Sequence, residues 1–109
     1  MRAMSDTWGL EGTAEGLFVR GEIDLASAEQ FEERACQAVM DTPGSSVLMD
    51  LSGVTFMDSA GIRALIRLME LRSGRSLVVR PSRQVFMLLE LVALTDGVLP
   101  DVEILEPPA

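Results

Sequence analysis

A short apolar run, SSVLMDL at residues 45–51, constrains the fold of this chain more than any other segment. Runs of this length with β-branched and long aliphatic side chains are typical of strands covered on both faces. We expect this strand at the centre of a sheet. A helical pattern follows at 58–72, and a second apolar segment, SLVV at 76–79, precedes Pro81. Strand, helix and strand in that order predict a right-handed crossover between parallel strands.

The segments around this unit predict the rest of a single α/β domain over residues 1–109, with a mixed sheet and packed helices. Two runs flanking a glycine-containing turn predict a hairpin, with 8–11 facing 17–23. The other expected elements are a helix at 28–40 with a Ser27–Gln30 capping box, a loop at 52–57, a helix at 83–94 capped by Ser82, and an edge strand at 102–105. The ends, about 1–6 and 106–109, are expected to be flexible.

Charge and missing residue types exclude several functions. The 17 acidic and 9 basic residues give a net charge of -8, which repels phosphate backbones and anionic lipid surfaces. All nine basic residues are arginine, so a Ser-His-Asp triad, a Schiff-base lysine, a P-loop lysine and a histidine metal site are excluded. We therefore expect a protein that is no enzyme, holds no metal or cofactor, and binds neither nucleic acid nor membrane.

The single cysteine and the apolar runs bear on location. Cys36 falls within a helical pattern and has no second cysteine to pair with, which fits a reducing compartment. The longest apolar run, VFMLLELVAL, is broken at Glu90 and is too short to span a bilayer. No apolar segment follows a charged head at the start of the sequence, as a secretory signal would require. These features predict a cytoplasmic protein.

The stretch FMDSAGIRAL, residues 56–65, contains the candidate functional residue, Ser59. Ser59 lies where a loop meets the helix expected at 58–72. The free N–H groups and the dipole at such a helix start would favour a phosphate. We expect Ser59 to cap the helix, which would stabilise it by about 1 kcal/mol. Asp58, directly before Ser59, either caps the same helix or orients the serine.

The helix after Ser59 has a wider apolar arc than one core contact usually needs. Its polar residues form a narrow strip, Arg63, Arg67 and Glu70. The small residues Gly61 and Ala64 widen the apolar side, and two interpretations of them are open. They receive another protein, or a second helix of the same domain covers them.

Two segments, RGEIDLASAEQFEE and DLSGVTFMDSAGIRAL, resemble the STAS domain of bacterial anti-sigma factor antagonists, and the order of elements agrees over nearly the whole chain. The resemblance implies a mixed sheet with packed helices and a non-enzymatic switch. In such a switch, the serine matching Ser59 is phosphorylated by a GHKL-type kinase that is also the anti-sigma factor. The unmodified form binds that partner and frees the sigma factor, and a PP2C-type phosphatase resets the switch.

The candidate contacts with the partner are Glu22, Asp24, Asp58, Gly61 and Ala64, of which the resemblance implies Glu22 and Asp24. Glu22 and Asp24 either belong to an acidic surface seen by the kinase or are solvated residues at a strand end. Ala60 replaces a second hydroxyl found in many relatives, so Ser59 is the only phosphoacceptor in the motif. We interpret Ser59 as both cap and switch. Many relatives finish with a further amphipathic helix, whereas this sequence finishes in EILEPPA.

Two other functions remain as alternatives. The first is a STAS domain that is never phosphorylated and serves as a scaffold or as a subunit of a transport system. The second is an enzyme with Ser59 as nucleophile, which is disfavoured because the sequence has no histidine or lysine to activate that serine.

Overall fold

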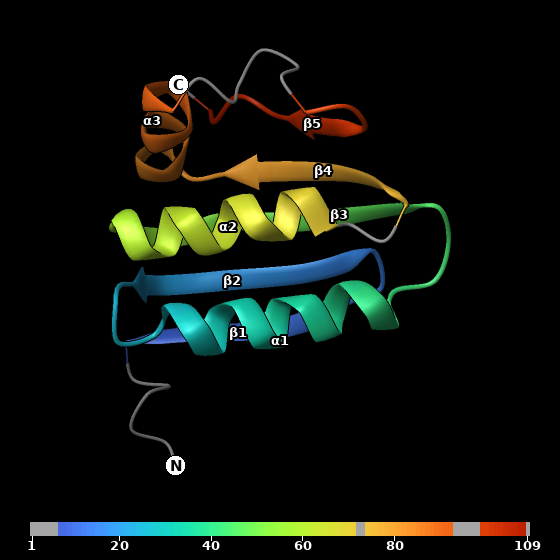
Figure 1. Ribbon diagram of the computed structural model, residues 1–109, viewed down its shortest axis with the longest axis horizontal. Helices are drawn as coiled ribbons and strands as arrows, with labels where there is room; N and C mark the ends of the chain where they lie inside the picture. The colour runs from blue at the N-terminus through green and yellow to red at the C-terminus, as the bar shows by residue number, and fades with distance from the viewer. Residues whose placement is uncertain (1–6, 72–73, 93–98, 109) are drawn as a thin grey trace.

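The computed structural model describes residues 7–71, 74–92 and 99–108, which form a five-stranded sheet and three helices (Figure 1). In chain order the elements are β1 Trp8–Thr13, β2 Gly16–Ile23, α1 Ala28–Asp41, β3 Ser46–Met57, α2 Ser59–Leu71, β4 Ser76–Pro81, α3 Arg83–Leu91 and β5 Val102–Ile104. β1 pairs antiparallel with β2, and β2 to β5 run parallel in the order of the sequence. The predicted mixed sheet, hairpin and edge strand are confirmed.

The order of the strands determines where the helices lie. Each parallel neighbour is reached through one helix, and crossovers of the same hand between adjacent strands place successive helices on the same face. Figure 1 shows α1 and α2 in front of the sheet. In β3, Val47, Met49 and Leu51 are buried, whereas Leu48 and Asp50 are half-buried. The expectation that this strand is covered on both faces is therefore wrong for the part of the chain that the structure describes.

β3 is longer than the sequence predicts, and the loop expected at 52–57 is wrong. These residues continue the strand and pair with the second half of β2. The register between the two strands shifts twice along this half, and each shift breaks the alternation of buried and exposed side chains. Val54 and Met57 are nevertheless buried. An apolar residue at every third position is not the pattern of a regular strand, which is why the segment resembles a loop in the sequence.

The starts of α1 and α3 test two of the expected serine caps, and one of the two differs from expectation. Ser82 caps α3 as predicted, because its Oγ accepts a hydrogen bond from the Val85 N–H at 3.3 Å. Ser27 makes no such bond to α1, so the capping box with Gln30 is wrong. Instead the Ser27 N–H donates to Asp24 Oδ1 at 3.2 Å, and the Asp24 N–H donates to Ser27 Oγ at 3.0 Å. The reciprocal pair therefore lies one turn earlier, directly after β2 ends.

Parts of the expected elements fall outside the described residues. They are residues 1–6, residue 72 of the helix expected at 58–72, residues 93–94 of the helix expected at 83–94, and residue 109. Gly74, two residues before β4, has a positive φ of 72°, a conformation that glycine adopts readily. No helix in the described ranges is long and apolar enough to cross a membrane.

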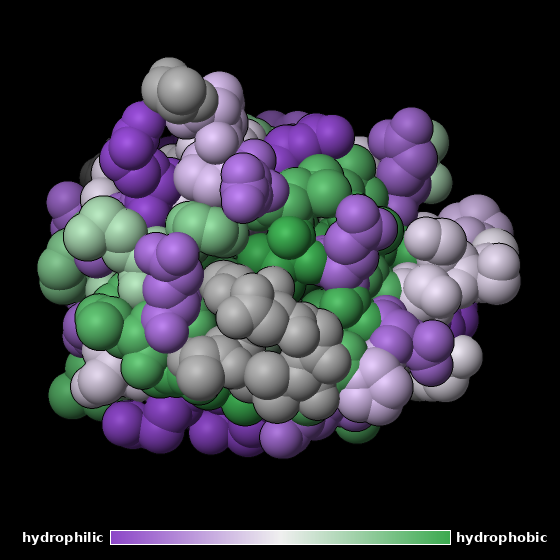
Figure 2. Space-filling model, turned by 90° about the horizontal axis from the view of Figure 1, so that it is seen from above, coloured by the Kyte–Doolittle hydropathy of each residue, from purple (hydrophilic) through white to green (hydrophobic). Residues whose placement is uncertain are grey.

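Hydrophobic side chains lie on two sides of α3. Val85 and Leu89 are buried against the sheet, whereas Met87 and Leu91 are exposed. Figure 2 looks down on this end of the molecule and shows hydrophobic side chains reaching the surface. The end of the domain that carries α3 is therefore more apolar than the acidic composition suggests.

The apolar arc of α2 is covered within the domain. Its buried residues are Ala60, Gly61, Ile62, Ala64, Leu65, Leu68 and Met69. Ala64, at 0% exposure, lies in a helix that packs on the sheet and contacts α1. Both small residues are therefore covered within the domain, Gly61 by the ends of β2 and β3, and Ala64 offers no exposed surface to a partner.

Replacing Ala64 with arginine should destabilise the domain. The longer side chain would overfill a closed core and bury an unpaired charge, so we expect the free energy of unfolding to fall by roughly 3 kcal/mol or more. Glu70→Arg, at an exposed position of the same helix, is the control and should change it by less than about 0.5 kcal/mol. Urea denaturation measures both variants. If Ala64→Arg were as stable as the control, α2 would not be packed as described.

Candidate functional site

The candidate residues gather where β2, β3 and β4 end, at the side of Figure 1 where α2 begins. The carboxyl ends of parallel strands lie at one edge of a sheet, and ligands of open α/β sheets commonly bind there. Glu22 and Asp24 belong to the end of β2 and the turn after it. Asp58 and Ser59 lie at the corresponding junction between β3 and α2.

Asp58 is the N-cap of α2. Its Oδ1 accepts hydrogen bonds from the N–H groups of Ala60 at 3.0 Å and Gly61 at 3.1 Å. Its Oδ2 accepts a third bond, at 3.1 Å, from the N–H of Leu25 in the turn after β2. The Asp58 carboxylate therefore accepts the N–H groups at the start of α2 and joins this helix to a turn 33 residues away in sequence. Of the two roles open to Asp58, the structure shows the cap.

Ser59 is the first residue of α2, and its side chain is exposed. Its hydroxyl forms no hydrogen bond with any residue in the described ranges. The expectation that Ser59 caps the helix is therefore wrong, because the carboxylate of Asp58 already accepts the N–H groups that a cap would bind. As a result, the Ser59 hydroxyl faces solvent from a fixed point at the start of a helix.

Gly61 allows α2 to approach the ends of β2 and β3. A Cβ atom at this position would lie 2.7 Å from the Ile23 carbonyl oxygen and 2.6 Å from Cγ of Met57. Both distances are too short for a carbon atom, so any larger residue would push the first turn of α2 away from the sheet. Gly61 is buried and positions Ser59 by packing.

Gln84 supports the same junction from α3. Its Oε1 accepts a hydrogen bond from the Met57 N–H at 2.8 Å, one residue before Asp58. No sequence pattern predicts this contact, because glutamine near a helix start is common on exposed surfaces. Together, Asp58 and Gln84 hold the end of β3 from two sides.

The surface around Ser59 is partly apolar and partly acidic. Leu25 is 77% exposed and Phe56 is 44% exposed, so two large hydrophobic side chains reach the surface here. Glu22 is exposed and lies opposite Phe56 in the pairing of β2 with β3. Asp24 is half-buried, and its carboxylate accepts a hydrogen bond from the Ser27 N–H. We call Glu22, Leu25, Phe56 and Ser59 the switch surface. Sequence reasoning did not single out Leu25 or Phe56, although apolar residues next to polar strand ends are a usable signal.

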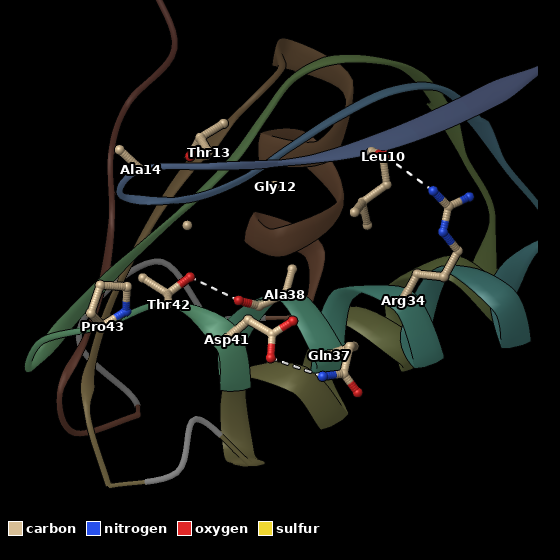
Figure 3. Close-up of a pocket in the computed structure, with 11 residues that line it drawn as sticks. Leu10, Gly12, Thr13, Ala14, Arg34, Gln37, Ala38, Asp41, Thr42 and Pro43 are labelled. Carbon is tan, nitrogen blue, oxygen red and sulfur yellow. Dashed lines mark hydrogen bonds between the residues drawn. The ribbon is translucent and has the colours of Figure 1, made fainter.

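A separate hollow of about 520 Å³ lies at the other end of the sheet, between the β1–β2 hairpin and the second half of α1 (Figure 3). Its polar side chains are already bonded within the domain. Arg34 donates to the Leu10 carbonyl at 3.1 Å, and Gln37 donates to Asp41 at 2.9 Å. None of the candidate residues lines this hollow. The described ranges also contain no group of three potential metal ligands.

Comparison with known proteins places this geometry in a family context. The chain matches the model of the STAS domain over residues 14–104. A curated relative, the anti-sigma F factor antagonist of Lysinibacillus sphaericus, is 30% identical over 82 residues, which span 68% of this chain and 70% of the relative.

Two solved structures are also similar. One is an anti-sigma factor antagonist from Mycobacterium paratuberculosis, with a TM-score of 0.63, 27% identity, and coverage of 89% of this chain and 84% of that chain. The other is the anti-sigma factor antagonist SpoIIAA in its unphosphorylated form. It has a TM-score of 0.60 and 24% identity, covers 92% of this chain and 89% of that chain, and is similar in fold.

The cap geometry predicts different effects for two adjacent residues. Asp58→Ala removes the acceptor of three backbone N–H groups and should lower the free energy of unfolding by roughly 1–2 kcal/mol. Ser59→Ala removes no hydrogen bond and should change it by less than about 0.5 kcal/mol. Asp58→Asn should fall between them, because one amide oxygen can still accept but the amide nitrogen cannot. Thermal and urea denaturation measure these differences, and a larger loss in Ser59→Ala than in Asp58→Ala would contradict the assignment of the cap.

Proposed function

This chain belongs to the STAS-domain family of anti-sigma factor antagonists, and we propose that phosphorylation of Ser59 switches off its binding to an anti-sigma factor. The unphosphorylated form binds the anti-sigma factor and so frees the sigma factor. The partner is an anti-sigma factor with GHKL-type serine kinase activity, and a PP2C-type phosphatase restores the free serine. In this proposal the protein works in the cytoplasm as a binding protein and catalyses no reaction itself.

The observation that carries the proposal is the exposed hydroxyl of Ser59, which has no hydrogen-bond partner in the described ranges. A kinase must bring this oxygen to the γ-phosphorus of ATP. The Ser59 Oγ–P bond then forms as the bond between the γ-phosphorus and ADP breaks, and the hydroxyl proton passes to a base of the kinase. A serine whose hydroxyl is free and whose backbone is held by Asp58 suits this transfer.

Electrostatics supports a switch that acts on binding. Phosphorylation adds a charge of about -1.5 to -2 beside Asp58 and near Glu22. The N–H groups of Ala60 and Gly61, which would otherwise bind an anion at a helix start, are already bonded to Asp58. If a partner without a cation of its own covered this surface, the excess negative charge of the phosphate would be buried at a cost of several kcal/mol, and each ~1.4 kcal/mol lowers the affinity tenfold.

The switch surface supplies the contacts for the partner. Leu25 and Phe56 are the apolar anchors, and Glu22 provides an acidic contact for a basic residue of the anti-sigma factor. Asp24 and Asp58 act behind this surface, because each holds backbone N–H groups at the junctions that carry it. Gly61 and Ala64 contribute by packing beneath it.

Ser59→Ala should separate binding from regulation. We expect it to bind the anti-sigma factor with an affinity close to that of the wild-type protein, and to stay bound when ATP is added. The wild-type protein should be phosphorylated and released. Ser59→Asp should bind poorly, although one carboxylate charge reproduces the phosphate dianion only in part. Mass spectrometry after incubation with the kinase and ATP, together with calorimetric titration, makes the comparison.

Ser52→Ala is the matched control, because Ser52 is exposed on the same strand that leads to the site. This variant should be phosphorylated and released like the wild-type protein. The proposal is wrong if phosphate appears on Ser52 or Thr55 instead of Ser59. Absence of phosphate from the protein after incubation with the kinase and ATP would instead favour a scaffold or a transport-system subunit. Binding that is unaffected by a phosphate on Ser59 would contradict the switch.

A further inference from the structure

The exposed side of α2 carries a stripe of residues at four-residue intervals, Ser59, Arg63 and Arg67. Residues four apart on a helix lie on the same side, with Cβ atoms about 6 Å apart. The stripe therefore places one arginine next to Ser59 and a second arginine about 12 Å from it along the helix axis.

The two arginines differ in their partners. Arg67 is held by Glu32 of α1, with Nη2 to Oε1 at 2.7 Å and Nε to Oε2 at 3.0 Å. Hydrogen bonds from Arg67 keep the pKa of Glu32 below its usual range, against a small opposing effect of burial. Arg63 is exposed and forms no hydrogen bond or ion pair with the residues that the structure describes. Arg63 is thus the unengaged cation of the stripe.

The start of α2 offers little else to a phosphate. The N–H groups of Ala60 and Gly61 bind Asp58, and the charged groups around Ser59 at the ends of β2 and β3 are acidic. These groups are Glu22, Asp24 and Asp58, with Glu29 exposed in the first turn of α1. A dianion placed among them needs a cation.

Resting on the proposed phosphorylation of Ser59, we infer that Arg63 is the counter-ion that the domain itself supplies to the phosphoryl group. An anionic residue four positions before a cationic one is the favourable order on a helix. The guanidinium group can donate two parallel N–H bonds to phosphate oxygens, which a lysine at the same position could not do.

This pairing would have two consequences for the switch. It would offset part of the repulsion between the phosphate and the acidic groups around it, so the phosphorylated domain stays folded. It would also draw the Arg63 side chain towards the start of α2. The unmodified surface presents a free cation and a hydroxyl to a partner, whereas the modified surface presents an arginine paired with a phosphate.

The test uses protein with phosphoserine installed at position 59 during translation, so that no kinase is needed. Phosphorus NMR follows the second ionisation of the phosphate, which has a pKa of about 6 in a free phosphoserine. A nearby guanidinium favours the dianion, so Arg63→Gln should raise this pKa by about 0.3 to 0.7 units, a two- to fivefold change in proton affinity. Arg63→Lys should restore part of the shift.

Arg67→Gln is the matched control, with the same change of charge on the same stripe. At an ionic strength of about 0.1 M the screening length is roughly 10 Å, so this variant should move the phosphate pKa by less than about 0.1 units. The inference is overturned if Arg63→Gln leaves the pKa unchanged, or if both variants shift it equally. Because the phosphate is installed directly, these results are independent of whether a kinase modifies Ser59, which the partner-binding experiment decides separately.

Discussion

Both carboxylate oxygens of Asp58 are bonded to backbone N–H groups, and the rest of the site depends on this arrangement. Oδ1 fixes the first turn of α2, while Oδ2 fixes the turn that follows β2. Neither turn could be held there by local sequence alone, because the two segments are far apart in the chain. Because Asp58 accepts the N–H groups at the start of α2, Ser59 does not cap the helix and its hydroxyl remains exposed. The residue that caps α2 and the residue proposed for phosphorylation are thus neighbours with separate roles.

Small residues under the site serve this geometry. Gly61 lets the first turn of α2 contact the ends of two strands, and Ala64 lets the same helix lie close to the sheet and α1. The firm support beneath Ser59 explains why the proposed switch acts on partner binding, because a charge added at the exposed hydroxyl displaces no core contact. In the proposed switch, Leu25 and Phe56 keep their exposed positions, and phosphorylation of Ser59 changes only the charge beside them.

The sequence predicted most of the fold because its helices and short strands follow regular periodicities. It failed at 52–57, where two register shifts against β2 disrupt the alternation that identifies a strand. It also assigned caps to Ser27 and Ser59 from local spacing, whereas Ser27 pairs with Asp24 in the turn before α1 and Asp58 caps α2 in place of Ser59. The contact of Asp58 with Leu25 depends on tertiary structure, and no short-range pattern encodes it.

Asp58 should hold α2 independently of what happens at Ser59. This independence is measured by amide hydrogen exchange at Ala60 and Gly61, followed by NMR in the unmodified protein and in protein with phosphoserine at position 59. Protection at both amides should agree within about twofold between the two forms, because the phosphate leaves the bonds to Asp58 intact. A loss of protection of about tenfold or more, equivalent to ~1.4 kcal/mol, would show that the phosphate displaces Asp58 and that the switch remodels the helix start.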